Sequence, residues 1–487
     1  MKTSIVSRFL VVGVLVAATC AALAYTRGDG PSPNPGPGPI SGVEPRPAVG
    51  ASAGAVTVSA RLTRDKVHVG GDGTASLALT LAAERPESEI AAAARPVDLV
   101  VVLDRSGSMD GAKMQNALAA LRGLLERLTP SDRFALVSYA SDIRRDSGLL
   151  PASPANRERI LAAANRIRAG GGTNLGGGLR MGIDILRSAE TATGVSRVIL
   201  ISDGLANEGV ADPEILGRMA AEATEYRLSV STAGVGADFN EELMTAIADR
   251  GTGAYYFLDR PEAFAAAFES AFREARQAVA TGVEIRVPLT DGVALIHAAG
   301  YPVETGDGFA VFRPGDLLGG QERRLFLTFR VPADSEGEFG IEGLEARFAG
   351  ADGPVALRLP ERFVIACVPD PRAAAASIDK EVWERQVLQD DFNRLRDGIA
   401  GALRRGDSRE ARRKIREYRE STAVLNDAVG SEAVQWNLNA ELPALEAEVE
   451  ASFAAGATAP SAIQRAAKKM QYEAYRGRRD RKAPEAP

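Results

Sequence analysis

The sequence predicts a multidomain fold: a doubly wound α/β domain, inserted in or flanked by an antiparallel β-sandwich, followed by a C-terminal α-helical region. Across residues 96–280, nearly continuous apolar runs alternate with amphipathic stretches, which is typical of a parallel sheet covered by helices on both faces. Residues 281–369 instead alternate with a period of two, and residues 370–487 are rich in Ala, Glu and Arg with helical spacing.

The predicted α/β domain begins with a strand at residues 97–103, where Asp98 interrupts an otherwise apolar run. In the stretch that follows, Met114, Leu121 and Leu125 recur at helical spacing and form one apolar face. Further strands are predicted at residues 134–139, 197–202, 229–235 and 254–258, and further helices at residues 154–167, 175–188, 213–226, 240–249 and 261–280.

Two separate segments carry the pattern of half-buried antiparallel strands. Within residues 281–369, side chains such as Val283 and Ile285 alternate with polar ones, and Gly, Pro and Asp separate the short runs. Residues 56–95 show the same alternation, so we expect this segment to join the same sandwich and the α/β domain to be an insertion between its two parts. Residues 370–487 are expected to form three or four helices.

The N-terminal segment predicts export. Lys2 and Arg8 are followed by a 16-residue, mostly apolar run that ends in Ala22-Leu23-Ala24, a small-x-small pattern typical of a signal-peptidase site. This run is shorter than the roughly 20 residues that a membrane-spanning helix needs. We therefore expect residues 1–24 to be a signal peptide that is removed.

Two other fates of this segment stay open: acylation at Cys20 as a lipoprotein, and retention as an uncleaved membrane anchor. All three fates place the protein outside the cytoplasm, in the periplasm, at the cell surface or secreted. Residues 25–55 are rich in Pro, Gly, Ser and Ala with few large apolar side chains, so we expect an extended linker that holds the folded body away from a membrane or wall.

The composition argues against several classes of protein. Lys and Arg number 58 against 64 Asp and Glu, a net charge of −6, so there is no overall basic field for nucleic acid. The two cysteines, Cys20 and Cys367, are too few for a disulfide scaffold or a Cys-rich zinc site. The two histidines, His68 and His297, fall in strand-like segments far apart, which leaves little material for histidine-dependent catalysis.

Three short motifs mark a candidate site at the carboxyl ends of predicted strands. An Asp-x-Ser-x-Ser pattern, formed by Asp104, Ser106 and Ser108, follows the first strand; Thr173 follows three glycines just before a helix; and Asp203 ends another apolar strand. Open α/β sheets bind ligands at this edge. We therefore expect these five residues to converge on one crevice.

Two carboxylates and three hydroxyls form an oxygen-only donor set, which suits Mg²⁺, Mn²⁺ or Ca²⁺ and argues against zinc or copper. Mg²⁺ is the preferred assignment, because it takes about six oxygens and keeps waters readily. Neutral hydroxyls leave the ion electrophilic, so it can accept a Glu or Asp carboxylate from a protein partner. The alternative is that the hydroxyls only cap helices and that Asp203 closes a turn.

These residues resemble the metal-ion-dependent adhesion site of the von Willebrand factor type A (VWA) family, whose pattern is Asp-x-Ser-x-Ser, a distant Thr and a distant Asp. All five positions are intact in this sequence. The resemblance covers roughly residues 96–280 and includes Pro130-Ser131-Asp132-Arg133-Phe134 before the second strand. It implies a Rossmann-like domain in which the hydroxyls contact the metal, the acids act directly or through water, and a partner carboxylate completes the coordination. The order of segments also resembles bacterial exported VWA proteins.

The residues favour a non-enzymatic binding or adhesion module. Ser108 lies in no Gly-x-Ser-x-Gly elbow, and the sequence contains neither a Walker motif nor His-Glu-x-x-His. A metal-assisted hydrolase is the least favoured alternative, because an ion held largely by neutral hydroxyls comes with no evident general base. A structural scaffold with a vestigial metal site is the other alternative, and the intact five-residue set argues against it.

Overall fold

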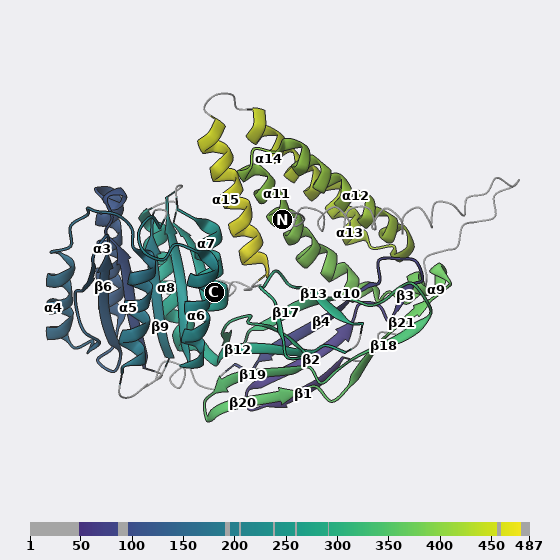
Figure 1. The fold of residues 1–487 in the computed structure, drawn as a ribbon, viewed down its shortest axis with the longest axis horizontal. Helices are drawn as coiled ribbons and strands as arrows, with labels where there is room; N and C mark the ends of the chain where they lie inside the picture. Colours follow the sequence, from purple (N-terminus) through teal and green to yellow (C-terminus); the bar gives the residue numbers. More distant parts are fainter. Residues whose placement is uncertain are drawn as a thin grey trace, which may run out of the picture.

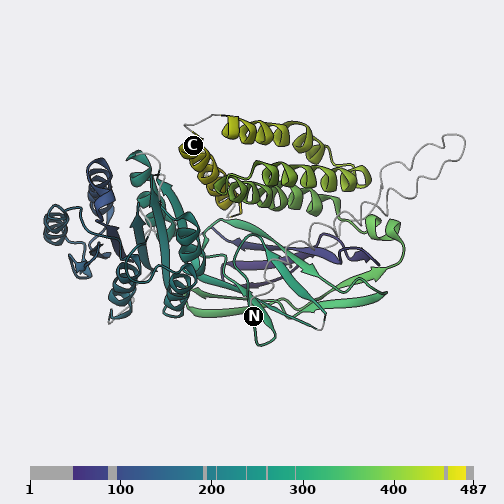
Figure 2. The same ribbon diagram turned by 45° about the horizontal axis from the view of Figure 1, so that its top comes forward.

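The computed structural model describes residues 48–85, 96–189, 195–203, 206–236, 239–258, 261–290, 292–454 and 459–478. It contains an α/β region, a region of mostly antiparallel sheets and a helical region, and the helices lie over one side of the β region in both views (Figures 1 and 2). The predictions made for residues 1–24, including Cys20, lie outside the described residues. Within the described residues, no helix combines the length and apolar character needed to cross a membrane.

The α/β region is built on a seven-stranded sheet. Its order is β11 (Thr252–Leu258), β10 (Leu228–Val235), β9 (Val195–Ser202), β5 (Val97–Asp104), β6 (Arg133–Tyr139) and β7 (Ile143–Arg145), and β8 (Leu150–Pro151) also pairs with β6. The first five strands are parallel, whereas β7 and β8 run antiparallel to β6. Successive side chains of β5 pack into separate cores on opposite faces of the sheet: Leu99 and Val101 on one face, Val100 and Val102 on the other. This two-sided burial explains the continuous apolar run in the sequence.

Helices cover both faces of this sheet, which confirms the predicted α/β class. One core contains side chains from α3 (Ala112–Arg127), α4 (Pro154–Ala164) and α8 (Pro261–Gln277), and the other from α5 (Leu175–Arg187), α6 (Pro213–Glu225) and α7 (Glu241–Arg250). Helix α5 comes especially near the strands, because a Cβ atom at Gly182 would lie 2.5 Å from Val102 Cγ2 and one at Gly178 would lie 2.7 Å from the Tyr139 ring. The two glycines therefore set the position of α5 and of the loop before it.

Three further sheets share one apolar core. Their orders are β1-β2-β4-β17-β13, β14-β15-β12-β19-β20 with β16 beside β12, and β18-β21-β3. All pairs are antiparallel except β21 with β3. The bounds are β1 (Val49–Ala53), β2 (Val56–Leu62), β3 (Lys66–His68), β4 (Thr74–Ala83), β12 (Ala278–Pro288), β13 (Ala294–Ala298), β14 (Glu304–Gly306), β15 (Phe309–Phe312), β16 (Leu317–Leu318), β17 (Glu322–Arg330), β18 (Gly337–Glu342), β19 (Glu345–Gly350), β20 (Gly353–Arg358) and β21 (Arg362–Val368).

Strand β4 pairs with β17 from Thr74 opposite Arg330 to Ala82 opposite Glu322. Segments that lie on either side of the α/β region in the sequence are thus neighbours in one sheet. One prediction needs correction: residues 49–53, expected to belong to the linker, form β1 and pair with β2. The small side chains of this segment show no alternation of apolar and polar residues. The strand is defined instead by its backbone hydrogen bonds to β2.

The C-terminal region is helical, as predicted, but consists of more pieces than three or four. They are α9 (Pro371–Ala376), α10 (Lys380–Arg385), η3 (Gln386–Asp391), α11 (Phe392–Arg404), α12 (Ser408–Val429), α13 (Glu432–Trp436), η4 (Asn437–Glu441), α14 (Leu442–Ala454) and α15 (Ala459–Arg478), of which η3 and η4 are π-helical turns. Side chains of Asp370, Asp379, Asp407 and Ser431 accept backbone N–H groups at the starts of helices, so each caps a new helix.

Helix α15 connects the helical region to the α/β region, and Figure 1 shows it between the two. The Tyr475 side chain belongs to the same core as α5, α6 and α7. Its hydroxyl accepts the backbone N–H of Tyr255 at 2.8 Å, and the two rings meet edge to face at 5.4 Å. Since Tyr255 lies on β11, an outer strand of the sheet, α15 satisfies a donor that the ladder leaves open.

Candidate metal centre

The two predicted acids lie at neighbouring strand ends. Asp104 is the last residue of β5, and Asp203 directly follows β9. The two strands are parallel neighbours, with Leu103 opposite Ile201, so their carboxyl ends meet at the same edge of the sheet. Both acids are almost fully buried, with exposed fractions of 0% for Asp104 and 1% for Asp203.

The two serines of the first loop join Asp203. The Ser108 hydroxyl donates to Asp203 Oδ1 at 2.7 Å, and the hydroxyls of Ser106 and Ser108 are 3.1 Å apart. Three oxygen-bearing side chains from two strand ends are therefore in contact with one another.

Asp104 lies behind this group and is held by donors on both oxygens. Its Oδ1 accepts the Ser106 N–H at 2.7 Å, and its Oδ2 accepts the hydroxyls of Ser202 at 2.7 Å and Tyr139 at 3.4 Å. Burial raises the pKa of Asp104, the hydrogen bonds from Ser106 and Ser202 oppose that change, and the negative charge of Asp203 adds to it. A cation at this place would favour the ionised form of Asp104.

Thr173 is placed by backbone hydrogen bonds. Its N–H donates to Asn207 Oδ1 at 2.8 Å, and its C=O accepts the N–H groups of Asn207 and Glu208 at 3.2 and 3.3 Å. Two residues earlier, Gly171 O accepts the Gly107 N–H at 3.1 Å. The Thr173 loop is thus tied to both the Asp-x-Ser-x-Ser loop and the segment after Asp203.

The helix-capping alternative fits these contacts poorly. Ser106 makes no side-chain cap hydrogen bond, and Ser108 lies inside the short helix η2 (Gly107–Met109). The cap of α5 is Asn174, whose Oδ1 accepts the Gly177 N–H at 3.0 Å, so Thr173 does not serve as the cap. The three hydroxyls therefore have no capping role that would explain their presence.

Sequence reasoning missed several residues that shape this group. Lys113, in the first turn of α3, forms an ion pair with Asp203 Oδ2. Ser202 and Tyr139 hold Asp104, and Asn207 holds Thr173. Ser202 and Tyr139 could have been found, because both stand at the carboxyl ends of predicted strands, where the ligand edge of the sheet lies.

The donor set fits a hard divalent ion. Among the described residues, no three His, Cys, Asp or Glu side chains are placed to hold a metal together. The candidate set has only two acids, and its other donors are hydroxyls. Such a set suits Mg²⁺, which is usually bound by one or two carboxylates and keeps several waters. Two buried carboxylates at one place require a positive charge nearby, and Lys113 supplies part of it through its ion pair with Asp203.

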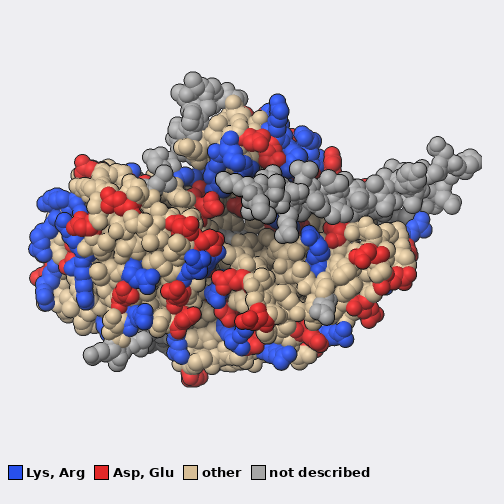
Figure 3. All heavy atoms as spheres, in the orientation of Figure 1, with Lys and Arg blue, Asp and Glu red and all other residues tan. Residues whose placement is uncertain are grey.

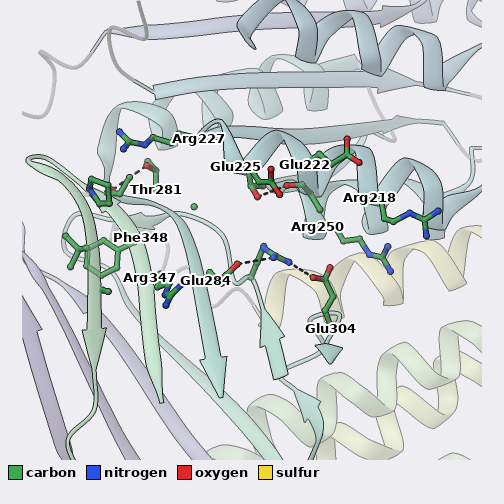
Figure 4. Close-up of a pocket in the computed structure, with 18 of the residues that line it drawn as sticks. Arg218, Glu222, Glu225, Arg227, Arg250, Thr281, Glu284, Glu304, Arg347 and Phe348 are labelled. Carbon is green, nitrogen blue, oxygen red and sulfur yellow. Dashed lines mark hydrogen bonds and ion pairs between the residues drawn. The ribbon is translucent and has the colours of Figure 1, made fainter. Parts of the chain in front are cut away.

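A different cleft, of about 810 Å³, lies between the α/β and β regions (Figure 4). None of the five candidate residues lines it. Several of its charges are paired with each other: Arg250 with Glu214 at 2.8 Å, and Arg313 with Glu284 and Glu304, both at 2.9 Å. The face in Figure 3 likewise mixes acidic and basic side chains, in keeping with the near balance of charge in the sequence. The carboxyl ends of β5 and β9, where two buried acids lie beside hydroxyl groups, thus remain the candidate functional site.

The comparisons with known proteins agree with this fold. The family model of the von Willebrand factor type A domain matches residues 98–270. An uncharacterized protein of Synechocystis is 27% identical over 267 residues, which are 52% of this chain and 61% of that protein. Inter alpha-trypsin inhibitor heavy chain 4 of Mus musculus is 31% identical over 157 residues, 31% of this chain and 17% of that protein. The chain therefore spans less than two thirds of either relative.

Among solved structures, a von Willebrand factor type A protein from Catenulispora acidiphila superposes with a TM-score of 0.61 at 19% identity, over 86% of this chain and 96% of that one. At this identity the likeness concerns the fold alone. It extends well beyond residues 98–270, because most of both chains is covered.

Proposed function

We propose that this protein, whose residues 98–270 form a von Willebrand factor type A domain, is an exported module that binds a protein partner through a divalent cation. Domains of this family mediate protein–protein interactions, so a protein partner is in keeping with the fold. The observation that carries the proposal is the contact of Ser106, Ser108 and Asp203 in front of Asp104, in an arrangement that capping does not explain.

In this proposal the hydroxyls of Ser106, Ser108 and Thr173 would hold the ion, and Asp104 and Asp203 would act directly or through water. When bound, the ion supplies a Lewis-acidic position that a Glu or Asp carboxylate of the partner can take. Ser202 and Tyr139 orient Asp104, and Asn207 orients the Thr173 loop. The chain thus contributes a pre-positioned oxygen set rather than a large negative charge.

Binding is favoured over catalysis by the surroundings of the group. The Ser108 hydroxyl donates a hydrogen bond to Asp203, and the two histidines lie in β3 and β13, outside the α/β region. Among the described residues, neither histidine is therefore near the candidate ion position to act as a general base.

We expect Mg²⁺ to bind the full chain with one ion per molecule and to raise its melting temperature. At an ion concentration of about 100 times Kd, binding would add about 2.7 kcal/mol to the free energy of unfolding. Isothermal titration and thermal unfolding with Mg²⁺, Mn²⁺ and Ca²⁺ measure this directly. Asp203→Ala and Ser108→Ala should each abolish the signal.

The matched control is Asp110→Ala, which removes an exposed acid from the same loop but none of the five candidate ligands. It should bind Mg²⁺ like the unchanged chain. A wild-type chain that gives no signal with any of the three ions, or a Ser108→Ala variant that binds as tightly as wild type, would contradict the proposed site.

Export is part of the proposal and rests on residues 1–24. If the signal is cleaved after Ala24, the mature protein begins at Tyr25, and mass spectrometry of protein recovered from expressing cells should show the loss of those 24 residues. A lipid-modified Cys20 at the N-terminus would identify a lipoprotein. An intact N-terminus in the membrane fraction would identify an uncleaved anchor. Full-length protein in the cytosol would contradict export.

A further inference from the structure

Lys113 occupies an unusual position for a lysine. It is the second residue of α3, which has no acidic residue in its first turn. The N-terminus of a helix carries the positive end of the helix dipole, so a cation is disfavoured there. An interaction elsewhere must offset this local cost.

That interaction is the ion pair with Asp203. The Lys113 ammonium contacts Asp203 Oδ2, while Ser108 occupies Oδ1, so both oxygens of the buried carboxylate are engaged. The Asp203 side chain is 0% exposed, whereas that of Lys113 is 34% exposed. The lysine therefore reaches from the surface to a fully buried acid.

The neighbouring arginine does not share this role. Arg105 follows Asp104 in the sequence, but its guanidinium pairs with Asp142 and donates to the Asp142 backbone oxygen. Among the ion pairs of the described residues, Lys113 is thus the cation that pairs with an acid of the candidate metal centre, Asp203.

We propose that Lys113 is a built-in competitor of the divalent ion: its ammonium neutralises Asp203 in the ion-free chain and must leave Asp203 Oδ2 when the ion binds. This inference rests on the proposed metal-dependent function. An ammonium and a divalent ion repel each other at such short range, so one site does not hold both at low cost. Because Lys113 is partly exposed, its head group can move outward to water without unfolding α3. Lys113 thereby lowers the resting affinity for the ion and makes binding more dependent on a partner carboxylate.

Replacing Lys113 with Met tests this, since Met keeps the length and helix propensity of the side chain without its charge. We expect the Kd for Mg²⁺, measured by isothermal titration of the full chain, to fall about tenfold or more. Without ion, the variant should melt at a lower temperature than wild type, because Asp203 loses its counter-charge; with saturating Mg²⁺ this deficit should disappear. Lys113→Arg, which keeps the charge, should retain an affinity close to that of wild type.

Arg122→Met is the matched control, because it removes an exposed positive charge from the same helix away from the site. It should leave the Mg²⁺ affinity unchanged within about twofold. If Lys113→Met does not fold, Lys113→Gln replaces it in the same titration. A Kd for the Lys113 variants that is equal to or weaker than that of wild type overturns the inference while leaving the metal site in place. Absence of Mg²⁺ binding in wild type overturns the proposed function and, with it, the inference that rests on that function.

Discussion

Replacing Asp132 with Ala is expected to lower the free energy of unfolding by about 3–5 kcal/mol, the cost of breaking a buried ion pair by removing one partner. The Asp132 side chain is 0% exposed and accepts four hydrogen bonds: from Val97 N at 2.9 Å, from Thr129 N at 2.6 Å, from Thr129 Oγ1 at 2.9 Å and from Arg276 Nη2 at 2.6 Å. These donors belong to the start of β5, the turn before β6 and helix α8. One carboxylate therefore joins three elements, and its loss would leave buried donors unsatisfied.

Urea unfolding followed by circular dichroism measures this loss. Glu126→Ala, on the exposed side of α3, is the control and should change stability by less than about 0.5 kcal/mol. Asp132 precedes β6 at the amino ends of the strands, roughly 20 Å from the candidate metal centre at their carboxyl ends. The folded fraction of the Asp132 variant should therefore still bind Mg²⁺. A loss of stability below about 1 kcal/mol would show that the four hydrogen bonds contribute little.

The strands of the α/β region and the placement of the acids could be predicted because their signals are local. A strand buried on both faces must be apolar throughout, so its end is visible in the sequence, and a polar motif at that end identifies the ligand edge. Asp104 and Asp203 follow from this argument alone. The hydroxyls of Ser106 and Ser108 follow from their short distance in sequence to Asp104.

Other features could not be predicted because their signals are not local. A lysine in a first helical turn resembles any solvated residue, and only the fold shows that Lys113 reaches Asp203 across 90 positions of sequence. Tyr475 and Tyr255 are separated by 220 positions, and nothing near either residue indicates the other. Strand β1 consists of small residues, so it is defined by hydrogen bonds to β2 and not by an apolar pattern.

Glu241 looks ordinary in the sequence but has an unusual environment in the fold. Glu241 lies in the first turn of α7, where an acid is favoured by the helix dipole and is usually exposed. Here it is 3% exposed, and its neighbours are Tyr255 on β11, Lys468 on α15, and Arg404 and Asp397 on α11. Burial raises the pKa of Glu241 to about 7, although Lys468, Arg404 and the Tyr255 hydroxyl oppose the change.

This shift predicts that the protein loses stability as the pH rises. Above the ordinary Glu pKa of about 4.5 the unfolded carboxyl is ionised, while the folded one keeps its proton until about pH 7. The folded state binds more protons in that window, so the free energy of unfolding falls between about pH 4.5 and pH 7 and is constant above it. Glu241→Gln removes the titrating group, and we expect it to be more stable than wild type by about 1–3 kcal/mol at pH 8 and by much less at pH 5.

The control for this prediction is Glu242→Gln, an exposed neighbour in the same helical turn, whose effect should not depend on pH. Urea unfolding of wild type, Glu241→Gln and Glu242→Gln is measured at pH 5, 6, 7 and 8. The pH series separates two explanations for a stable Glu241→Gln variant: better packing of the Gln side chain, or loss of the buried carboxyl. If Gln merely packs better, its advantage over wild type is the same at every pH, and the prediction is wrong. If the buried carboxyl is responsible, the advantage grows through the titration range, because burial disfavours the ionised form of Glu241 and not the protonated one.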